Sequence, residues 1–505
     1  MPLLIAFFVA LCSLVWLATK KRSDKKKLPP EVGQSWPFLG HLHLLRSSRP
    51  THRVLGEIAD KCGPIFTIKL GRQLVVVVNN WETAKECFTT NDRSFASRPD
   101  LVFSCLLGFE NCNFGFAPYG DFWRQLRKIV TIDLLSNNRL STFKELRETE
   151  IRIASRELRK FWEQHRDSSN KAMVDIKSWI RDITLNFIMK IVLGKATGYA
   201  TGDDAGVKIA DWKVYTAEFS ALFGKIVIAD ALPLLRWLDI GNEEKTIKSA
   251  VKKVDSILNA WLMEHKENAN MENGDFMHLL IKILEKSKVN IEGRDPDSVL
   301  KATCLGLVLA ASDTTVITMT WAFASLLTHP QKLKKVQEEI DAHVGRERTV
   351  RESDTKNFVY LKAVVKETLR LFPAVPLLLH HFSVEDCTVA GYHIPANTIL
   401  IPNVWKIHRD PQVWENPSEF SPERFIESRK DVDVRGQNFE LIPFGSGRRM
   451  CPGINFAFQV IELTMASLLH EFDFVPCGAI DWTESVGMTA LMPPPLNIYV
   501  TPRLP

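Results

Sequence analysis

The stretch Phe444-Gly445-Ser446-Gly447-Arg448-Arg449-Met450-Cys451-Pro452-Gly453 decides how the rest of the chain is interpreted. It places the thiol of Cys451 behind two arginines and between two glycines, immediately before an apolar run that predicts a helix. Positive charge and backbone N–H groups stabilise a thiolate, which favours a metal ligand or a nucleophile. Glycine adopts positive φ at little cost, so Gly447 and Gly453 allow the backbone to turn tightly around the sulfur.

A lone cysteine is more often simply buried, but here every position of the pattern F-x-x-G-x-R-x-C-x-G is met. Arg449 adds a guanidinium whose fork of donors suits a carboxylate. Haem needs both a ligand for its iron and partners for its two propionates. The segment resembles the haem-binding loop of the cytochrome P450 monooxygenases, and the resemblance extends over essentially the whole chain. It implies haem b as cofactor and Cys451 as the axial ligand of the iron.

Composition indicates a large globular protein. The chain has 505 residues, of which 45% are hydrophobic and 24% charged, and no linker divides it after residue 40. The net charge of +5 is modest and partly local, so nucleic-acid binding is not expected. Nine scattered cysteines, without a CxxC pair, do not form a disulfide framework and suit a reducing compartment.

The N-terminus differs from everything that follows. Residues 2–18 are almost wholly apolar and precede six basic residues between Lys20 and Lys27. About 17 residues at roughly 1.5 Å each span on the order of 25 Å, enough to cross a bilayer. Charge after the apolar run favours a retained anchor over a cleaved signal peptide, with the body in the cytosol. We expect a transmembrane signal-anchor at 1–19, a basic and proline-rich hinge at 20–40 and a catalytic domain at 41–505. The resemblance implies a single-pass protein of the endoplasmic reticulum membrane.

The body is predicted to be mainly α with a smaller β portion, an α+β fold. Alternating runs at 65–70 and 74–78 predict a hairpin, and strand signals return at 387–402. Helical periodicity covers 121–135, 139–166, 173–193, 244–267, 276–287, 297–328, 331–343 and 359–371. The P450 fold implied by the resemblance is of this kind.

Glu367 and Arg370 are three residues apart and so share one helix face. An isolated pair of this kind on a surface contributes little. In the P450 family a glutamate and an arginine on one helix meet a second arginine from a later loop, which Arg424 matches in Pro422-Glu423-Arg424-Phe425. The resemblance therefore implies that Glu367, Arg370 and Arg424 are structural residues behind the haem.

Ala310-Ala311-Ser312-Asp313-Thr314-Thr315 interrupts an apolar helix. By itself this is equally consistent with hydroxyls bonded to the preceding turn. In the family an acid and an alcohol here manage protons for oxygen activation, so Asp313 and Thr314 are the expected catalytic residues. Ala311 replaces the usual glycine and is expected to narrow the groove for dioxygen.

Further cofactor contacts are implied by position. Trp123 and Arg127 lie one helical turn apart and match the W-x-x-x-R element whose donors bind a haem propionate. His381 matches a basic position that often reaches the other propionate, although His380 and Phe382 make the surrounding pattern atypical. Arg449 and Cys451 complete the expected cofactor-binding set.

The substrate pocket is expected to be apolar. Its proposed lining comes from segments that correspond to pocket walls in relatives, and each residue alone is more often plain core. The lining residues are Leu107, Phe114, Phe116, Leu307, Ala311, Val375, Leu378 and Leu491.

These features favour an oxidase of small hydrophobic molecules. No G-x-G-x-x-G fingerprint is present, so electrons should come from a separate protein, NADPH–cytochrome P450 reductase, with O2 as oxidant. Pro29-Pro30 and the segment 385–395 resemble plant members of specialised metabolism, which act on terpenoids, alkaloids, phenolics and flavonoids. A desaturase or ring-forming oxidase uses the same chemistry and stays open. An O2-independent isomerase or lyase is less favoured, because Asp313 and Thr314 are retained. A non-enzymatic haem carrier would need neither residue.

Overall fold

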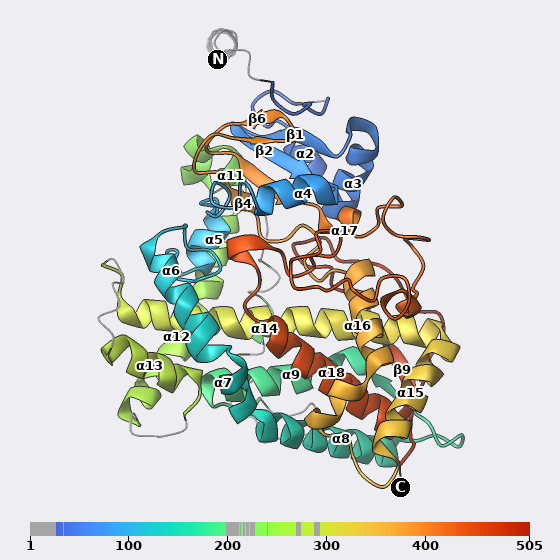
Figure 1. The fold of residues 1–505 in the computed structure, drawn as a ribbon. Coiled ribbons are helices and arrows are strands. Elements are labelled where there is room, and N and C mark those ends of the chain that lie inside the picture. The colour runs from blue at the N-terminus through green and yellow to red at the C-terminus, as the bar shows by residue number, and fades with distance from the viewer. Residues whose placement is uncertain are drawn as a thin grey trace.

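The computed structural model describes residues 27–33, 35–197, 212, 214–215, 218, 222, 228–239, 241–268, 274–286 and 293–504. The predicted membrane anchor at 1–19 and the first part of the hinge lie outside these residues. Figure 1 shows a sheet-containing region near the N-terminus and a larger helical region, with helix α14 crossing the latter.

Helices make up most of the described chain. The α-helices are α2 (Leu42–Leu45), α3 (Thr51–Cys62), α4 (Trp81–Phe88), α5 (Val102–Leu107), α6 (Asp121–Lys128), α7 (Asn137–Thr142), α8 (Lys144–His165), α9 (Ile176–Leu193), α11 (Ile228–Ala231), α12 (Glu243–Glu267), α13 (Phe276–Lys286), α14 (Pro296–Thr328), α15 (Pro330–Val344), α16 (Val359–Leu371), α17 (Val404–Ile407) and α18 (Ile454–Glu471). Short 3-10 helices are η2 (Pro233–Leu238), η3 (Glu352–Asn357), η4 (Pro422–Phe425) and η5 (Gly447–Arg449), and η1 (Ile129–Leu134) is a π-helix.

Three small sheets accompany the helices. The largest has the order β1-β2-β7-β4, from β1 (Ile65–Leu70), β2 (Gln73–Val78), β7 (Ile399–Pro402) and β4 (His381–Phe382). The second has the order β3-β9-β8, from β3 (Ala172–Asp175), β9 (Asn497–Pro502) and β8 (Phe472–Pro476), and the third pairs β5 (Cys387–Val389) with β6 (Tyr392–Ile394). The predicted hairpin is β1 and β2, with Ile68 opposite Val75. The predicted fold class, mainly α with a smaller β portion, is confirmed.

Helix α14 is the central element of the core. The side chain of Asp295 caps its start by accepting from the N–H of Ser298 at 2.9 Å, and Pro296 occupies the first turn. The helix ends at His329, because the following Pro330 disfavours a helical conformation there. Within the described chain, α14 alone is long and apolar enough to span a membrane, but 67% of its apolar window is buried inside the protein. It is therefore a core helix.

Three predicted helix boundaries are wrong, each for a local reason. The stretch 173–193 begins with a strand, because Ala172 and Val174 face the core and pair with β9 while Met173 points outward. The stretch 139–166 is broken at Phe143 into α7 and α8. The stretch 121–135 changes from α-helix to π-helix after Lys128. Periodicity alone does not distinguish these pieces from one continuous helix.

Candidate active site

The Cys451 loop is a compact turn that ends at the start of α18. The N–H of Cys451 donates to the carbonyl of Phe444 at 2.9 Å, and the N–H of Gly453 points at the Cys451 sulfur at 3.4 Å. Gly447 has a φ of 66°, and a Cβ there would lie 2.3 Å from Asp92 Oδ1. Only glycine fits both constraints, so this part of the sequence pattern has a steric cause.

The thiol of Cys451 is mostly enclosed by protein. Burial raises the pKa of the Cys451 thiol, while the N–H of Gly453 and the charge of Arg127 act in the opposite direction. The protein alone therefore leaves the sulfur protonated at neutral pH. A coordinated metal ion removes the proton from a thiol outright, so the arrangement suits a sulfur that becomes a thiolate when it binds a metal.

Three guanidinium groups surround this loop. Arg449 donates to the carbonyls of Ala96 at 2.5 Å and Ala117 at 2.7 Å. Arg98 donates to main-chain oxygens on two other segments, at 3.1 Å to Gly115 and at 2.8 Å each to Leu379 and His380. These contacts join the loops at 96–117 and 379–380 to the Cys451 loop.

Arg127 contacts the Cys451 loop directly, because its guanidinium donates to the carbonyl of Met450. Within the described chain, every hydrogen-bond partner of Arg98, Arg127 and Arg449 is a main-chain carbonyl. Burial lowers the pKa of Arg449 to about 8, with Arg98 and Arg127 adding to the effect. Burial, then the charge of Arg127, lowers the pKa of Arg98 to about 9.

Arg98 is buried and Arg127 and Arg449 are partly buried, and such a group of cations is costly without a compensating negative charge. Arginine remains protonated in proteins, so an anion must supply the balance. A cofactor that offers two carboxylates and a metal with affinity for sulfur meets both needs at once. The residues present therefore fit haem.

Trp123 and His381 lie in the same region, with their donors directed at the main chain. The indole N–H of Trp123 donates to the carbonyl of Phe114 at 3.0 Å, and Arg449 lies 4.2 Å above the indole ring. Nδ1 of His381 lies 2.9 Å from the carbonyl of Phe95. Burial, then the charge of Arg98, lowers the pKa of His381 well below its usual range, so the imidazole is neutral. That Trp123 and His381 contact propionates stays a prediction.

Arg98 is a site residue that sequence reasoning missed. It lies in Phe95-Ala96-Ser97-Arg98-Pro99, where the following proline favours an extended backbone. An arginine in an otherwise uncharged stretch directly before a proline was the available signal. Its position beside Arg449 depends on how three distant segments meet, which spacing does not reveal.

The middle of α14 has the predicted acid and alcohol. Ala311, Asp313 and Thr314 are partly exposed and Ala310 is exposed, whereas the helix on either side, at 299–305 and 315–327, is buried. The hydroxyl of Thr314 donates to the carbonyl of Ala310 at 2.6 Å. The oxygen of Thr314 thus keeps lone pairs available to accept a further hydrogen bond.

The proposed pocket residues fall into three groups. Phe114, Phe116 and Leu307 are buried in the main core cluster, and Ala311 and Leu491 contact that cluster from its edge. Leu378 is buried in a second cluster, beside the β1–β2 sheet. Val375 is partly buried, and the side chain of Leu107 lies outside the described part of the structure.

The loop that contains Leu491 is fixed by a buried lysine. Nζ of Lys177, in α9, donates to the carbonyls of Met492, Pro493 and Pro494 at 3.0, 2.9 and 2.7 Å. The three acceptors satisfy all three N–H bonds of the ammonium group. The backbone of this loop is thereby held without a contribution from the pocket-facing side chains.

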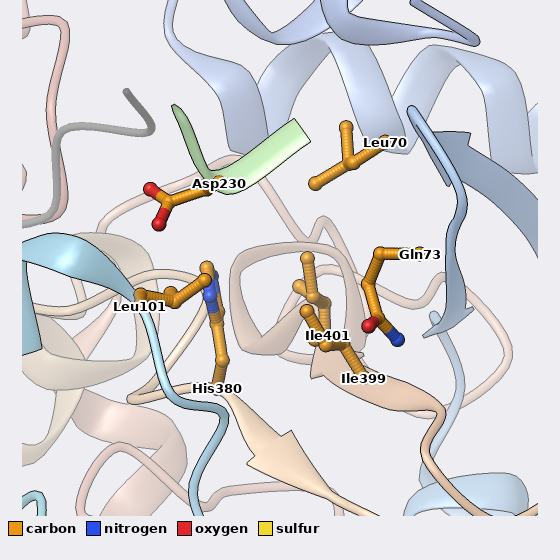
Figure 2. A pocket seen from close by; sticks show the side chains of 7 residues that line it. All are labelled: Leu70, Gln73, Leu101, Asp230, His380, Ile399 and Ile401. Atoms are coloured by element: carbon orange, nitrogen blue, oxygen red, sulfur yellow. The ribbon is translucent and has the colours of Figure 1, made fainter. Parts of the chain in front are cut away.

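Figure 2 shows a small pocket between the β1–β2–β7 sheet, the segment before α5, and α11. Its lining combines apolar and polar side chains: Leu70, Gln73, Leu101, Asp230, His380, Ile399 and Ile401. Burial, then the charge of Arg98, lowers the pKa of His380 to about 4, so its ring is neutral at physiological pH. His380, which replaces the proline usual in the family, therefore presents a neutral hydrogen-bonding group to this pocket.

The structure brings Glu367, Arg370 and Arg424 together in the interior. Glu367 Oε2 accepts from Arg370 Nε at 2.7 Å, and Glu367 Oε1 accepts from Arg370 Nη2 at 2.9 Å and from Arg424 Nε at 3.1 Å. Arg370 also donates to the carbonyl of His408 at 2.9 Å. Nε2 of His408 in turn accepts from the N–H of Ile442 at 2.9 Å, two residues before the Cys451 loop.

That last contact requires a neutral imidazole. Burial, then the charge of Arg370, lowers the pKa of His408 to about 3, so its Nε2 has a free lone pair at neutral pH. The chain of contacts from Glu367 through Arg370 and His408 therefore reaches the segment that leads into the Cys451 loop.

A sequence model of the Cytochrome P450 family matches residues 30–501. The chain belongs to the cytochrome P450 family. It is a P450 monooxygenase that binds haem and uses O2, a reductase as redox partner and small-molecule substrates.

Characterised plant P450s are similar over nearly the full length. Strychnine-10-hydroxylase of Strychnos nux-vomica is 44% identical over 99% of this chain and 96% of its own. Flavonoid-6-hydroxylase of Ocimum basilicum is 44% identical over 97% and 94%. Xanthotoxin 5-hydroxylase of Arabidopsis thaliana is 43% identical over 99% and 98%.

Solved P450 structures share the fold. A zebra fish cytochrome P450 with abiraterone is 27% identical and superposes with a TM-score of 0.74, over 90% of this chain and 99% of the other.

Replacement of Arg449 by glutamine is expected to lower the haem content of the purified protein to less than half. The variant removes one of the positive charges that would balance the propionates. The ratio of haem to protein measures the haem content. Arg448→Gln is the matched control, because Arg448 is exposed and pairs with Asp92. Equal loss in both variants would contradict a specific role for Arg449.

Glu367→Ala is expected to yield protein without bound haem. Removing one partner of a buried ion pair costs about 3–5 kcal/mol, because it leaves the other charges unpaired. The yield of folded haem protein after expression measures the effect. Glu427→Ala, at an exposed glutamate, should behave as wild type. Normal haem loading in the Glu367 variant would show that the network is dispensable.

Proposed function

We propose that this protein hydroxylates a small hydrophobic plant specialised metabolite, a terpenoid, alkaloid, phenolic or flavonoid. The observation that carries the proposal is the Cys451 loop, with the guanidinium groups around it. The chain also has apolar side chains at the positions expected to line a pocket, and a polar stretch within α14. The names of similar proteins support the substrate class, since they are hydroxylases of strychnine, flavonoids and xanthotoxin.

Haem b is the proposed form of the cofactor. Cys451 would provide its iron ligand, while Arg449, Arg127, Trp123, His381 and Arg98 would provide donors to the propionates. When bound, a haem with a thiolate ligand supplies an iron centre that favours cleavage of the O–O bond. The protein's task is then to hold the substrate, exclude water and deliver protons.

Asp313 and Thr314 are the proposed proton carriers. The Thr314 hydroxyl donates its hydrogen bond to the carbonyl of Ala310. Its oxygen can therefore accept a hydrogen bond from a water molecule. The partly exposed Asp313 carboxylate can pass protons toward the interior of the site. Retention of this pair favours an O2-dependent reaction over isomerase or lyase chemistry.

Ala311 is proposed to restrict the space beside these two residues. Its methyl group stands where the family usually has glycine, on the partly exposed face of α14. A smaller groove limits the orientations a substrate can adopt, which bears on the position of attack. Desaturation or ring formation uses the same residues and would be recognised from the product.

Electrons are proposed to come from NADPH–cytochrome P450 reductase at the endoplasmic reticulum membrane. Lys128 and Arg448 are exposed beside the Cys451 loop and offer positive charge to an acidic partner surface. Residues 1–19 would anchor the protein in membrane lipid as a single span, residues 20–40 would form the hinge, and the domain at 41–505 would face the cytosol.

A metabolite screen tests the proposed reaction. Microsomes that contain this protein and the reductase are incubated with NADPH and a panel of plant metabolites, and products are analysed by mass spectrometry. We expect an NADPH-dependent product with one added oxygen atom, which is absent for Cys451→Ser. A product lacking two hydrogens would indicate desaturation or ring formation instead. No NADPH-dependent turnover of any lipophilic candidate would contradict the proposal.

Thr314→Ala is expected to keep its haem but to consume several-fold more NADPH per product molecule. Loss of the hydroxyl disturbs proton delivery, so reduced oxygen is released as peroxide. The ratio of NADPH oxidised to product formed measures the coupling. Thr320→Ala is the control, since its hydroxyl is buried two turns away and donates to the carbonyl of Val316. Unchanged coupling in the Thr314 variant would remove this residue from the relay.

A further inference from the structure

Two histidines and an aspartate form a buried cluster that the P450 reaction does not use. His265 lies near the end of α12, Asp275 directly precedes α13, and His278 lies in the first turn of α13. Each residue offers one ligand atom, and these atoms all lie within 4.8 Å of one another. His265 is 4% exposed and His278 is 7% exposed, so the cluster belongs to the interior.

The carboxylate of Asp275 faces both imidazoles. Its Oδ2 lies 3.0 Å from Nε2 of His265, and its Oδ1 lies 3.2 Å from Nδ1 of His278. The two rings are 4.3 Å apart between centroids. Zinc bonds of about 2.0–2.1 Å in a tetrahedral site place neighbouring ligand atoms about 3.3 Å apart. The separations of both nitrogens from the carboxylate are close to that spacing.

The second nitrogen of His265 identifies where its proton lies. Nδ1 is 2.6 Å from the carbonyl of Trp261, which can only accept, so Nδ1 carries the hydrogen. Nε2 faces the Asp275 carboxylate, where a proton on the ring makes a hydrogen bond and a bound metal ion would take the place of that proton. A histidine that donates one N–H to a carbonyl and offers the other nitrogen is the usual arrangement of a metal ligand.

The imidazole of His278 faces the carboxylate with only one of its two nitrogens. Its Nε2 is buried and has no hydrogen-bond partner among the described residues, while its Nδ1 faces Asp275. Buried polar atoms are nearly always paired, so an exception calls for an explanation. Because Nδ1 is the atom that faces Asp275, Nδ1 would be the metal ligand, and the ring's remaining proton would then lie on Nε2.

We propose that His265, Asp275 and His278 bind one divalent transition-metal ion of the zinc class. The ligand set of two imidazoles and one carboxylate suits such an ion. Gly194 packs tightly against the carboxylate, since a Cβ there would lie 2.5 Å from Asp275 Oδ2. The neighbouring cation Lys195 is paired with Glu264 and so does not compete for Asp275.

The ion would tie the end of α12 to the start of α13. Both helices pack against α14, and α13 also packs against α9. A metal ion that binds only the folded chain raises the free energy of unfolding. At high metal concentration the increase grows with the logarithm of the ratio of free metal concentration to the Kd of the site. The site is therefore structural, remote from the Cys451 loop in sequence and separate from the haem reaction.

Direct metal analysis tests the site in the full-length, haem-loaded protein without an affinity tag. The protein is treated with a chelator, exposed to ZnCl2, freed of unbound zinc by gel filtration and analysed for zinc and iron. We expect one zinc per chain in addition to one iron, and a higher unfolding temperature after zinc addition. Zinc below one tenth of an equivalent at saturating ZnCl2 would overturn the proposal.

Variants locate the bound zinc. His278→Gln and His265→Gln are expected to weaken zinc binding at least ten-fold. The control His343→Gln removes an exposed histidine of α15 and should leave zinc binding unchanged. Equal zinc affinity in His278→Gln and wild type would overturn the assignment. The carbon monoxide difference spectrum of each variant reports the state of the haem site separately. An abnormal spectrum with normal zinc binding would count against the proposed P450 function and not against the zinc site.

X-ray absorption at the zinc edge of the wild-type protein gives a test that needs no variant to fold. The expected first shell contains only nitrogen and oxygen, with imidazole scattering behind it. A shell that contains sulfur would place the zinc at cysteines and overturn the proposal.

Discussion

The carboxylate of Glu367 is the interaction on which the placement of the Cys451 loop depends. It accepts from two guanidinium groups and from the N–H of Ser421, so each of its oxygens has partners in the interior. Arg370 directs its remaining donors to carbonyls of the segment at 408–419. A buried ionic group of this kind is tolerable only when every member is satisfied. Because this one is, α16 and the segment that leads toward the Cys451 loop are fixed relative to one another.

The haem-binding side of the protein follows a different electrostatic rule. Around Glu367 one carboxylate accepts from two guanidinium groups, whereas Arg98, Arg127 and Arg449, beside Cys451, have only main-chain carbonyl partners among the described residues. The first group contains its own anion, and the second has positive charge that suits an anionic cofactor. Folding and cofactor binding would therefore be linked, because a bound anionic cofactor would lower the cost of burying Arg98 and Arg449.

Much of this could be predicted from sequence where a local pattern has a local cause. Gly447 is fixed by its positive φ and its contact with Asp92, whereas the expected positive φ at Gly453 is wrong, since its φ is −92°. Glu367 and Arg370 share a helix turn, so this pair, like Gly447, could be recognised from spacing. Arg98 could not, because its role arises where three segments far apart in the chain meet. The strand at Ala172–Asp175 was also missed, since its partner, β9, lies more than 300 residues away. The donors of Trp123 and His381 contact carbonyls whose positions no pattern encodes.

The contacts of Arg98, Arg449 and Lys177 have one property in common: they end on main-chain oxygens. Every residue has a main-chain carbonyl, whatever its side chain. The backbone of these segments is therefore held in place independently of the side chains that they carry. Substitutions that face the substrate can then accumulate without loss of the scaffold. Evolution of new chemical selectivity in such a protein is thereby decoupled from its foldability, which gives a physical reason why similar proteins include hydroxylases of strychnine, flavonoids and xanthotoxin.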